Sequence, residues 1–134
     1  MRAALIGFIS LTLTSCTSVT KTPACNGTTM TETRLYFGMS IPHGKPVTTT
    51  KFDAFVRTQV VPRFAEGFTL LNASGQWLDT ETHQPLSESS KLLIRLHNAD
   101  AGQEAAISDI IAAYKAQFHQ QSVLRTDALV CAAF

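Results

Sequence analysis

The chain has 134 residues, of which 45% are hydrophobic and 16% are charged, the balance of a single globular domain. Eleven lysines and arginines stand against ten acidic residues, so the formal net charge is +1. A charge so close to zero gives no field that would attract phosphates or an anionic membrane surface. The composition therefore argues against nucleic acid as a partner, and the sequence contains no basic run or RNA-recognition signature.

The beginning of the chain predicts a signal peptide over residues 1–15. Arg2 provides a positive start, and residues 3–13 form the apolar run AALIGFISLTL, as in a targeting segment. A helix that spans a bilayer needs about 20 apolar residues, so this run is too short to cross one. We therefore expect this segment to be removed rather than to remain as a membrane span.

Cys16 follows the apolar run in a distinctive context. Leu13 lies three positions before it, and the small residues Thr14 and Ser15 lie between. This pattern resembles the bacterial lipoprotein signal, which implies a diacylglycerol on the Cys16 thiol and a stable membrane anchor. The alternative is an ordinary secretory signal with an unmodified cysteine. We expect the lipoprotein, and Thr17 in place of an aspartate favours the outer membrane, facing the periplasm.

The next segment, residues 16–31, is rich in Thr, Ser, Pro, Gly and Asn. It lacks a sustained apolar period, which is typical of a polar tether. The folded domain is therefore expected to occupy residues 32–134.

The first half of this domain shows one strand and one helix. Residues 33–40 alternate apolar and polar side chains and predict a strand. Phenylalanine and valine at helical spacing predict an amphipathic helix over 51–61. Thr50 and Asp53 have the spacing of a weak capping box at its start, and Pro62 ends it.

A hairpin is expected next. The second strand begins at Phe68 and is expected to be interrupted by a turn or bulge at Ser74-Gly75 before Gln76 and Trp77 resume it. A polar loop over 79–89 leads to the run KLLIRLHN. Its alternation predicts a strand of a sheet with one covered side. The inward set is expected to be Leu92, Ile94 and Leu96, and the opposite set Leu93, Arg95 and His97.

The last two elements complete the order. Apolar residues recur at helical spacing over 102–119 and predict the most regular helix of the chain, and a strand over 122–134 follows. The order strand, helix, strand, strand, helix, strand is typical of the α+β ferredoxin-like fold, in which two helices cover one face of a four-stranded antiparallel sheet.

Two cysteines lie within reach of the ends of this sheet. Without Cys16, an even pair remains, Cys25 and Cys131, in a compartment where oxidation is allowed. In a ferredoxin-like sheet the first and last strands are antiparallel neighbours, so the start of one lies beside the end of the other. We therefore predict a Cys25–Cys131 disulfide; two reduced thiols are the alternative.

Several stretches carry a family resemblance. They are LYFGMSIPHG, VVPRFAEGFTLLNASGQW, SESSKLL, IIAAYKAQFHQQSVLR and the terminal CAAF. Together they are similar to the small exported bacterial proteins of domain-of-unknown-function family 3574, over Cys25 to Phe134. The family carries no assigned activity, so the resemblance supports the fold and export but implies no reaction.

The sequence holds no nucleophile elbow, phosphate-binding loop or metal-binding motif. Candidate functional residues therefore have to be chosen one by one, by the chemistry of their side chains. The four histidines are far apart, which argues against a metal site; we expect no cofactor and name no catalytic residue. The candidate ligand-binding residues are a polar and aromatic set that offers guanidinium forks, stacking faces and one proton acceptor: Tyr36, Arg63, Gln76, Trp77, Glu88, Tyr114 and Arg125. The alternative is structural, with Trp77 and Tyr114 at core edges and Arg63 paired with Glu88.

Three functions are compatible with this sequence. The first is a lipid-anchored envelope protein whose domain is a non-catalytic module that binds an envelope protein or a small ligand. The second is a small enzyme or ligand carrier in which two ferredoxin-like sheets pair as a homodimer around an apolar pocket. The third is a surface lipoprotein that blocks a receptor.

Overall fold

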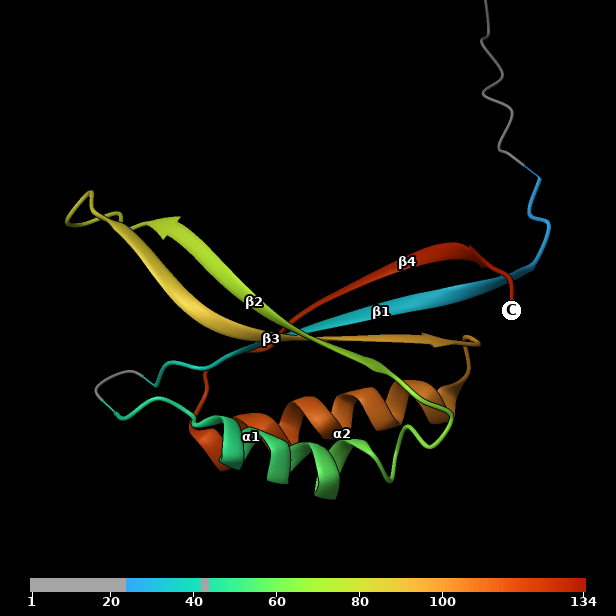
Figure 1. The fold of residues 1–134 in the computed structure, drawn as a ribbon, viewed down its shortest axis with the longest axis horizontal. Helices are drawn as coiled ribbons and strands as arrows, with labels where there is room; N and C mark the ends of the chain where they lie inside the picture. Colours follow the sequence, from blue (N-terminus) through green and yellow to red (C-terminus); the bar gives the residue numbers. More distant parts are fainter. Residues whose placement is uncertain (1–23, 42–43) are drawn as a thin grey trace, which may run out of the picture.

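The structure is a computed structural model that describes residues 24–41 and 44–134. The predicted signal peptide and Cys16 lie outside the described residues. In chain order the elements are β1 (Thr28–Gly38), α1 (Thr49–Phe55), η1 (Val56–Val60), β2 (Thr69–Leu78), β3 (Pro85–His97), α2 (Ala101–Phe118) and β4 (Leu124–Ala132). The strands form one antiparallel sheet in the order β2-β3-β1-β4, and the helices lie against one face of it (Figure 1). This confirms the ferredoxin-like prediction.

The first helix differs in detail from its prediction. It begins after Thr48, whose hydroxyl oxygen accepts a hydrogen bond from the backbone N–H of Lys51 at 3.3 Å, so the capping box predicted two residues later does not form. The helix then widens into a π-helical turn, η1, before Pro62. Val56 and Val60 of this turn are buried, as is Phe55 before them.

The second helix matches its prediction to within one residue at each end. Asp100 caps its start by accepting a hydrogen bond from the Gln103 N–H at 2.9 Å, which satisfies one of the free N–H groups of the first turn. The expected apolar face is buried, except that Ile111 lies only partly buried at its edge. None of the helices in the described chain is both long enough and apolar enough to cross a membrane.

An aromatic cluster fills the space between the helices and the sheet. The rings of Phe37 and Tyr114 lie 4.7 Å apart between centroids in an edge-to-face arrangement. Phe52, Phe55 and Phe118 surround this pair. Such pairs add to the free energy gained by burying apolar area, so this cluster holds both helices to β1.

The prediction of which face of β3 is covered is wrong. Leu93, Arg95 and His97 are buried, on the side of the helices, and the alternate residues point to the open face. Arg95 can be buried because its guanidinium lies over the ring of Phe64, 5.2 Å from the centroid, and pairs with Glu66 at 2.8 Å. The open face therefore carries the partly exposed apolar side chains Leu92, Ile94 and Leu96.

Two strands, β1 and β3, are longer than expected, and β2 lacks the interruption that was predicted. β1 begins at Thr28, inside the predicted tether, because it pairs from there with β4. β2 runs through Ser74 and Gly75 without a turn or bulge, since these residues pair in unbroken register with β3. β3 already begins at Pro85, which leaves only a short turn where the polar loop was predicted.

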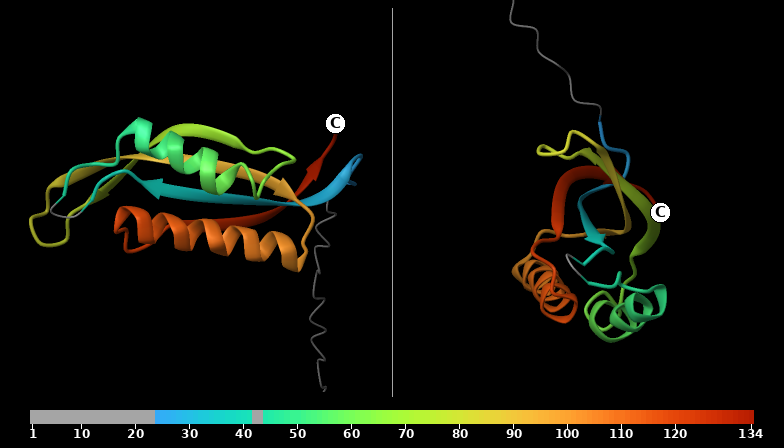
Figure 2. Two further views of the ribbon diagram at one scale, coloured as in Figure 1. Left: turned by 90° about the horizontal axis from the view of Figure 1, so that it is seen from below. Right: turned by 90° about the vertical axis from the view of Figure 1, so that its left-hand side faces the viewer.

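Cys25 and Cys131 form the predicted disulfide, with their Cα atoms 5.5 Å apart. Thr29 lies opposite Cys131 in the β1–β4 ladder, so the bond closes the sheet at the start of β1. Figure 1 shows this end close to the C-terminus, and Figure 2 shows the helices grouped on the far side of the sheet from the open face.

Candidate functional site

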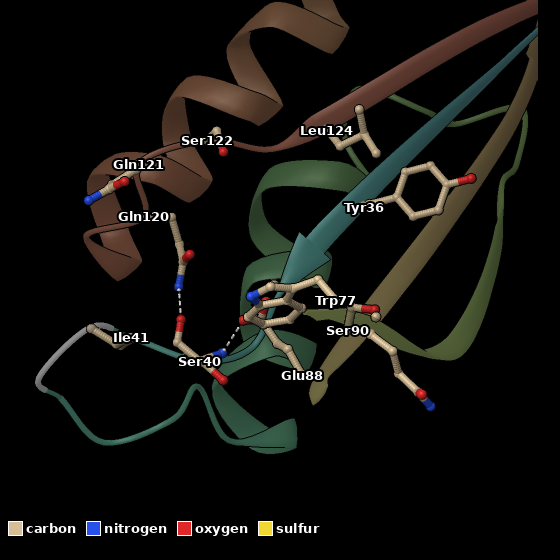
Figure 3. A pocket seen from close by; sticks show the side chains of 13 residues that line it. Tyr36, Ser40, Ile41, Trp77, Glu88, Ser90, Gln120, Gln121, Ser122 and Leu124 are labelled. Atoms are coloured by element: carbon tan, nitrogen blue, oxygen red, sulfur yellow. Dashed lines mark hydrogen bonds between the residues drawn. The ribbon is translucent and has the colours of Figure 1, made fainter. Parts of the chain in front are cut away.

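A pocket of about 580 Å³ opens on the uncovered face of the sheet, beside the end of β1. Its walls come from β1, the β2–β3 hairpin and the segment that follows α2 (Figure 3). Four of the seven residues predicted to bind a ligand line it: Tyr36, Gln76, Trp77 and Glu88. These four come from three strands, so the fold brings together side chains that are up to 52 positions apart in the sequence.

Glu88 holds a fixed position in this pocket. Its Oε1 accepts a hydrogen bond from the backbone N–H of Ser40 at 2.8 Å. A Cβ atom on Gly38 would lie 2.8 Å from the same oxygen, so the carboxylate rests against backbone that only glycine leaves free. The chain therefore places a carboxylate where β1 ends, with its second oxygen free of any hydrogen bond among the described residues.

Tyr114 supports the pocket from below and does not line it. Its side chain is fully buried on α2, and its hydroxyl donates a hydrogen bond to the Gly38 carbonyl at 2.8 Å. Burial, and to a lesser extent the charge of Glu88, raise the pKa of Tyr114. The hydroxyl therefore stays protonated and holds Gly38 from the side opposite to Glu88.

The segment after α2 provides the facing wall. His119 ends the helix in a left-handed conformation with φ of 52°, which turns the chain toward the sheet. Gln120 then donates a hydrogen bond from Nε2 to the Ser40 carbonyl at 2.6 Å. Ser40 is thus held at its N–H by Glu88 and at its carbonyl by Gln120, as the dashed lines of Figure 3 show.

Two aromatic side chains contribute the apolar surface. Trp77 is 49% exposed, far more than an indole of the core would be. Tyr36 is partly buried on β1 and lies opposite Leu124 of β4. Figure 3 shows Trp77 and Glu88 on one side of the pocket and Ser122 and Leu124 on the other. The site therefore combines stacking faces with one carboxylate.

Arg63 lies elsewhere and does not pair with Glu88, so the structural alternative for these two residues is wrong. Arg63 donates a hydrogen bond from Nη1 to the Gln59 carbonyl at 2.9 Å and its Nε lies 3.8 Å from Asp109. It connects η1 with α2 because both belong to the helical layer.

Arg125 also lies outside the pocket, in a second polar cluster beside the start of α2. It forms a two-pronged ion pair with Glu104, at 2.5 and 2.8 Å, and a further one with Asp127 at 2.9 Å. Asp127 accepts a hydrogen bond from the hydroxyl of the fully buried Thr33, at 2.5 Å. The same hydroxyl lies 2.9 Å from Nε2 of His97.

The polar groups of this cluster form hydrogen bonds with one another, and those bonds hold Asp127 ionised. Burial would raise its pKa, but the hydrogen bonds from Thr33 and Arg125 outweigh that effect and keep the pKa below the usual value. The pKa of Glu104 is also lowered, by its hydrogen bond from Arg125. The cluster is thus a closed network that joins β1, β3, β4 and α2.

Sequence reasoning missed the backbone of Ser40 and the amide of Gln120, which shape the pocket by hydrogen bonds. Both lie in the stretches that carry the family resemblance, which is the one signal that pointed to them. In residues 24–41 and 44–134 no three histidines, cysteines or acidic residues gather closely enough to hold a metal ion.

Comparison with known proteins gives one family and one fold. Residues 32–134 match the family described as Protein of unknown function (DUF3574). The search of curated proteins finds no match. A phage SAM lyase in complex with S-methyl-5′-thioadenosine superposes with a TM-score of 0.56 at 14% identity, over 84% of this chain and 88% of that chain. A phage SAM lyase in its apo state superposes with a TM-score of 0.57 at 16% identity, over 81% of this chain and 87% of that chain. The likeness shows a shared fold.

Proposed function

The chain belongs to the DUF3574 family, and from this premise we propose that it is a lipid-anchored protein of the bacterial envelope whose domain binds a small ligand. The observation that supports binding is the pocket of about 580 Å³ with its fixed carboxylate and its half-exposed tryptophan. A concave site with apolar surface and a few convergent polar groups is the usual form of a small-molecule site.

The position of the pocket suits a tethered domain. The disulfide ties Cys25 to the C-terminal end of β4, and the pocket lies beside Gly38 at the other end of β1. Eleven residues of strand separate the two ends, which is roughly 33 Å at the rise of a β-strand. A domain anchored through Cys16 would thus present its ligand site away from the tether.

The anchor is tested by Cys16→Ser in the full-length protein. We expect the wild type to incorporate labelled palmitate and to sediment with membranes, and the variant to lose both properties, since two or more acyl chains are needed for stable anchoring. Joint replacement of Cys25 and Cys131 by serine controls for a general effect of losing cysteines, because it leaves Cys16 in place. Palmitate labelling that persists in the Cys16 variant would disprove the anchor.

Ligand binding is tested by native mass spectrometry of the full-length protein, purified in a non-ionic detergent from its own host. We expect one small molecule to remain bound at a one-to-one ratio and to be lost from Trp77→Ala, which opens the pocket without touching the core. A protein that carries no small molecule before and after exposure to a host metabolite extract would contradict the binding function.

An enzyme at the same pocket is the second candidate. A free carboxylate oxygen on Glu88 is able to accept a proton from a bound substrate, and a phage SAM lyase shares the fold. Incubation with S-adenosylmethionine, followed by chromatography for S-methyl-5′-thioadenosine, tests this substrate directly. Release that depends on Glu88 would support an enzyme, and no release above that of S-adenosylmethionine incubated without protein would exclude this reaction.

A further inference from the structure

The charge of the pocket indicates which ligands it accepts. Of its described lining residues, Glu88 is the one with a charged side chain; the others are aliphatic, aromatic, amide or hydroxyl residues and glycine. The sign of the local field therefore comes from this carboxylate. An anionic ligand would meet a like charge and, among the described lining residues, no cation, which costs free energy in a partly enclosed site.

Among the described residues, no cationic side chain forms an ion pair with Glu88. In the described part of the chain, every ion pair involves other acidic residues. The sequence suggested Arg63 and Arg125 as cations of the site. Arg63 pairs with Asp109 instead, and Arg125 pairs with Glu104 and Asp127. The backbone N–H of Ser40 satisfies one oxygen of Glu88 and leaves the negative charge in place.

Aromatic faces accompany this charge. Trp77 and Tyr36 line the same pocket, and the indole is half exposed. The face of an aromatic ring carries partial negative charge, and tryptophan binds cations best. A carboxylate with two aromatic rings thus favours an organic cation, whose alkyl groups also fit against Leu124 and Ile41.

We propose that the pocket is selective for small organic cations, with a quaternary ammonium or sulfonium group between Glu88 and the aromatic side chains. This inference rests on the proposed binding function and names the chemical class of its ligand. A metal cation is a poor fit because a single carboxylate supplies too few oxygen ligands for one, whereas a diffuse alkylated cation needs no coordination shell.

The test uses the full-length protein in non-ionic detergent and its one tryptophan, Trp77, as the probe. Choline and trimethylsulfonium are titrated, and 3,3-dimethyl-1-butanol serves as the uncharged isostere of choline. We expect saturable changes in the emission of Trp77 with both cations, and at least tenfold weaker binding of the alcohol. The anion 3,3-dimethylbutyrate is expected to cause no saturable change.

Two variants identify the source of the selectivity. Glu88→Gln keeps the size of the side chain and an oxygen for the Ser40 N–H. We expect it to lower the preference for choline over the uncharged alcohol about fivefold, because only the attraction of the aromatic faces for the cation remains. Asp53→Asn removes the same charge from the exposed side of α1 and should leave this preference unchanged. Should Glu88→Gln fold poorly by circular dichroism, Tyr36→Leu replaces it and should weaken choline binding about fivefold.

The outcomes of this test distinguish the selectivity for cations from the proposed binding of a small ligand. Equal binding of choline and its uncharged isostere, or a preference for choline that is unchanged in Glu88→Gln, would overturn cation selectivity through this carboxylate and leave a ligand site of another class. A lack of saturable response to both cations would also overturn it. Whether the domain binds a small molecule at all is then decided separately, by the molecule that copurifies.

Discussion

Two carboxylates of the sheet, Glu88 on the open face and Asp127 on the helix-covered face, have different neighbours. Asp127 receives hydrogen bonds from Thr33 and Arg125, and Arg125 in turn is shared with Glu104. Glu88 receives one backbone N–H and no cation from the described residues. A carboxylate whose partners are all internal stabilises the fold, whereas one left open in a pocket is available to a ligand. The two faces of the sheet are therefore expected to respond differently to substitution.

The largest difference in the free energy of unfolding is expected between alanine variants of Phe37 and Leu124. Phe37→Ala empties the centre of the aromatic cluster on the covered face, and we expect it to lower the free energy of unfolding by about 4 kcal/mol. Leu124→Ala removes a side chain that is 59% exposed on the open face and should cost less than about 1 kcal/mol. Urea denaturation of both variants provides the measurement, and similar losses would show that the faces do not differ in this way.

The disulfide should affect stability without affecting the pocket. Joint replacement of Cys25 and Cys131 by serine opens a loop with a sequence separation of 106, and we expect a loss of about 3 kcal/mol because the unfolded chain gains entropy. The choline titration of Trp77 should not change at temperatures where the variant is folded. A weakened response there would show that the two ends of β1 are coupled.

Thr33→Val should break the closed network around Asp127. The change keeps the shape of the side chain but removes the hydroxyl that joins Asp127 with His97, so buried polar atoms lose a partner. We expect a loss of about 1–2 kcal/mol in the free energy of unfolding at pH 7. Thr126→Val, on the neighbouring strand, serves as the matched control and should have little effect.

The pH dependence of this network follows from the lowered pKa of Asp127. A carboxyl whose pKa is lower in the folded state contributes stability that is fully present above its unfolded pKa, about 3.9. That contribution is lost as the pH falls through the folded pKa. Stability of the wild type should therefore drop below about pH 4, and the drop should be shallower in Thr33→Val. Equal slopes for both proteins would argue against this role of Thr33.

The smallest effect on stability is expected from Glu88→Gln. The substitution leaves the hydrogen bond to the Ser40 N–H in place and breaks no ion pair, so the free energy of unfolding should change by less than about 0.5 kcal/mol. A loss above 2 kcal/mol would place Glu88 among the structural residues, alongside Asp127, and would remove the contrast between the two faces.

The sequence predicted the order of the elements, the sheet topology and the disulfide because these depend on local periodicity and on the geometry of the fold. It did not predict which side of β3 is covered. Both alternating sets of that strand contain apolar residues, and burial of Arg95 depends on Phe64 and Glu66, which are about 30 positions away. Turn chemistry at Ser74-Gly75 was likewise overridden by pairing with β3.

Only part of the candidate site was predicted, because contacts between residues far apart in the sequence decide which side chains reach it. Tyr36, Gln76, Trp77 and Glu88 were recognised by residue type, and the fold does bring them to one pocket. Arg63 and Arg125 are equally suited to bind a ligand by type, but each has an internal acidic partner that lies far away in the sequence. Whether a charged side chain is free or paired depends on such distant contacts.

The covalent link at the start of β1 has a mechanical consequence. Tension applied through the N-terminal segment reaches Cys25 first and is divided there between β1 and, through the disulfide, β4. Because β1 lies between β3 and β4, force between this point and a ligand held beside Gly38 would run along the strand and load its hydrogen bonds in shear, all at once. The bond also prevents the first rungs of the β1–β4 ladder from peeling open one by one, which is the mode in which a sheet resists force least.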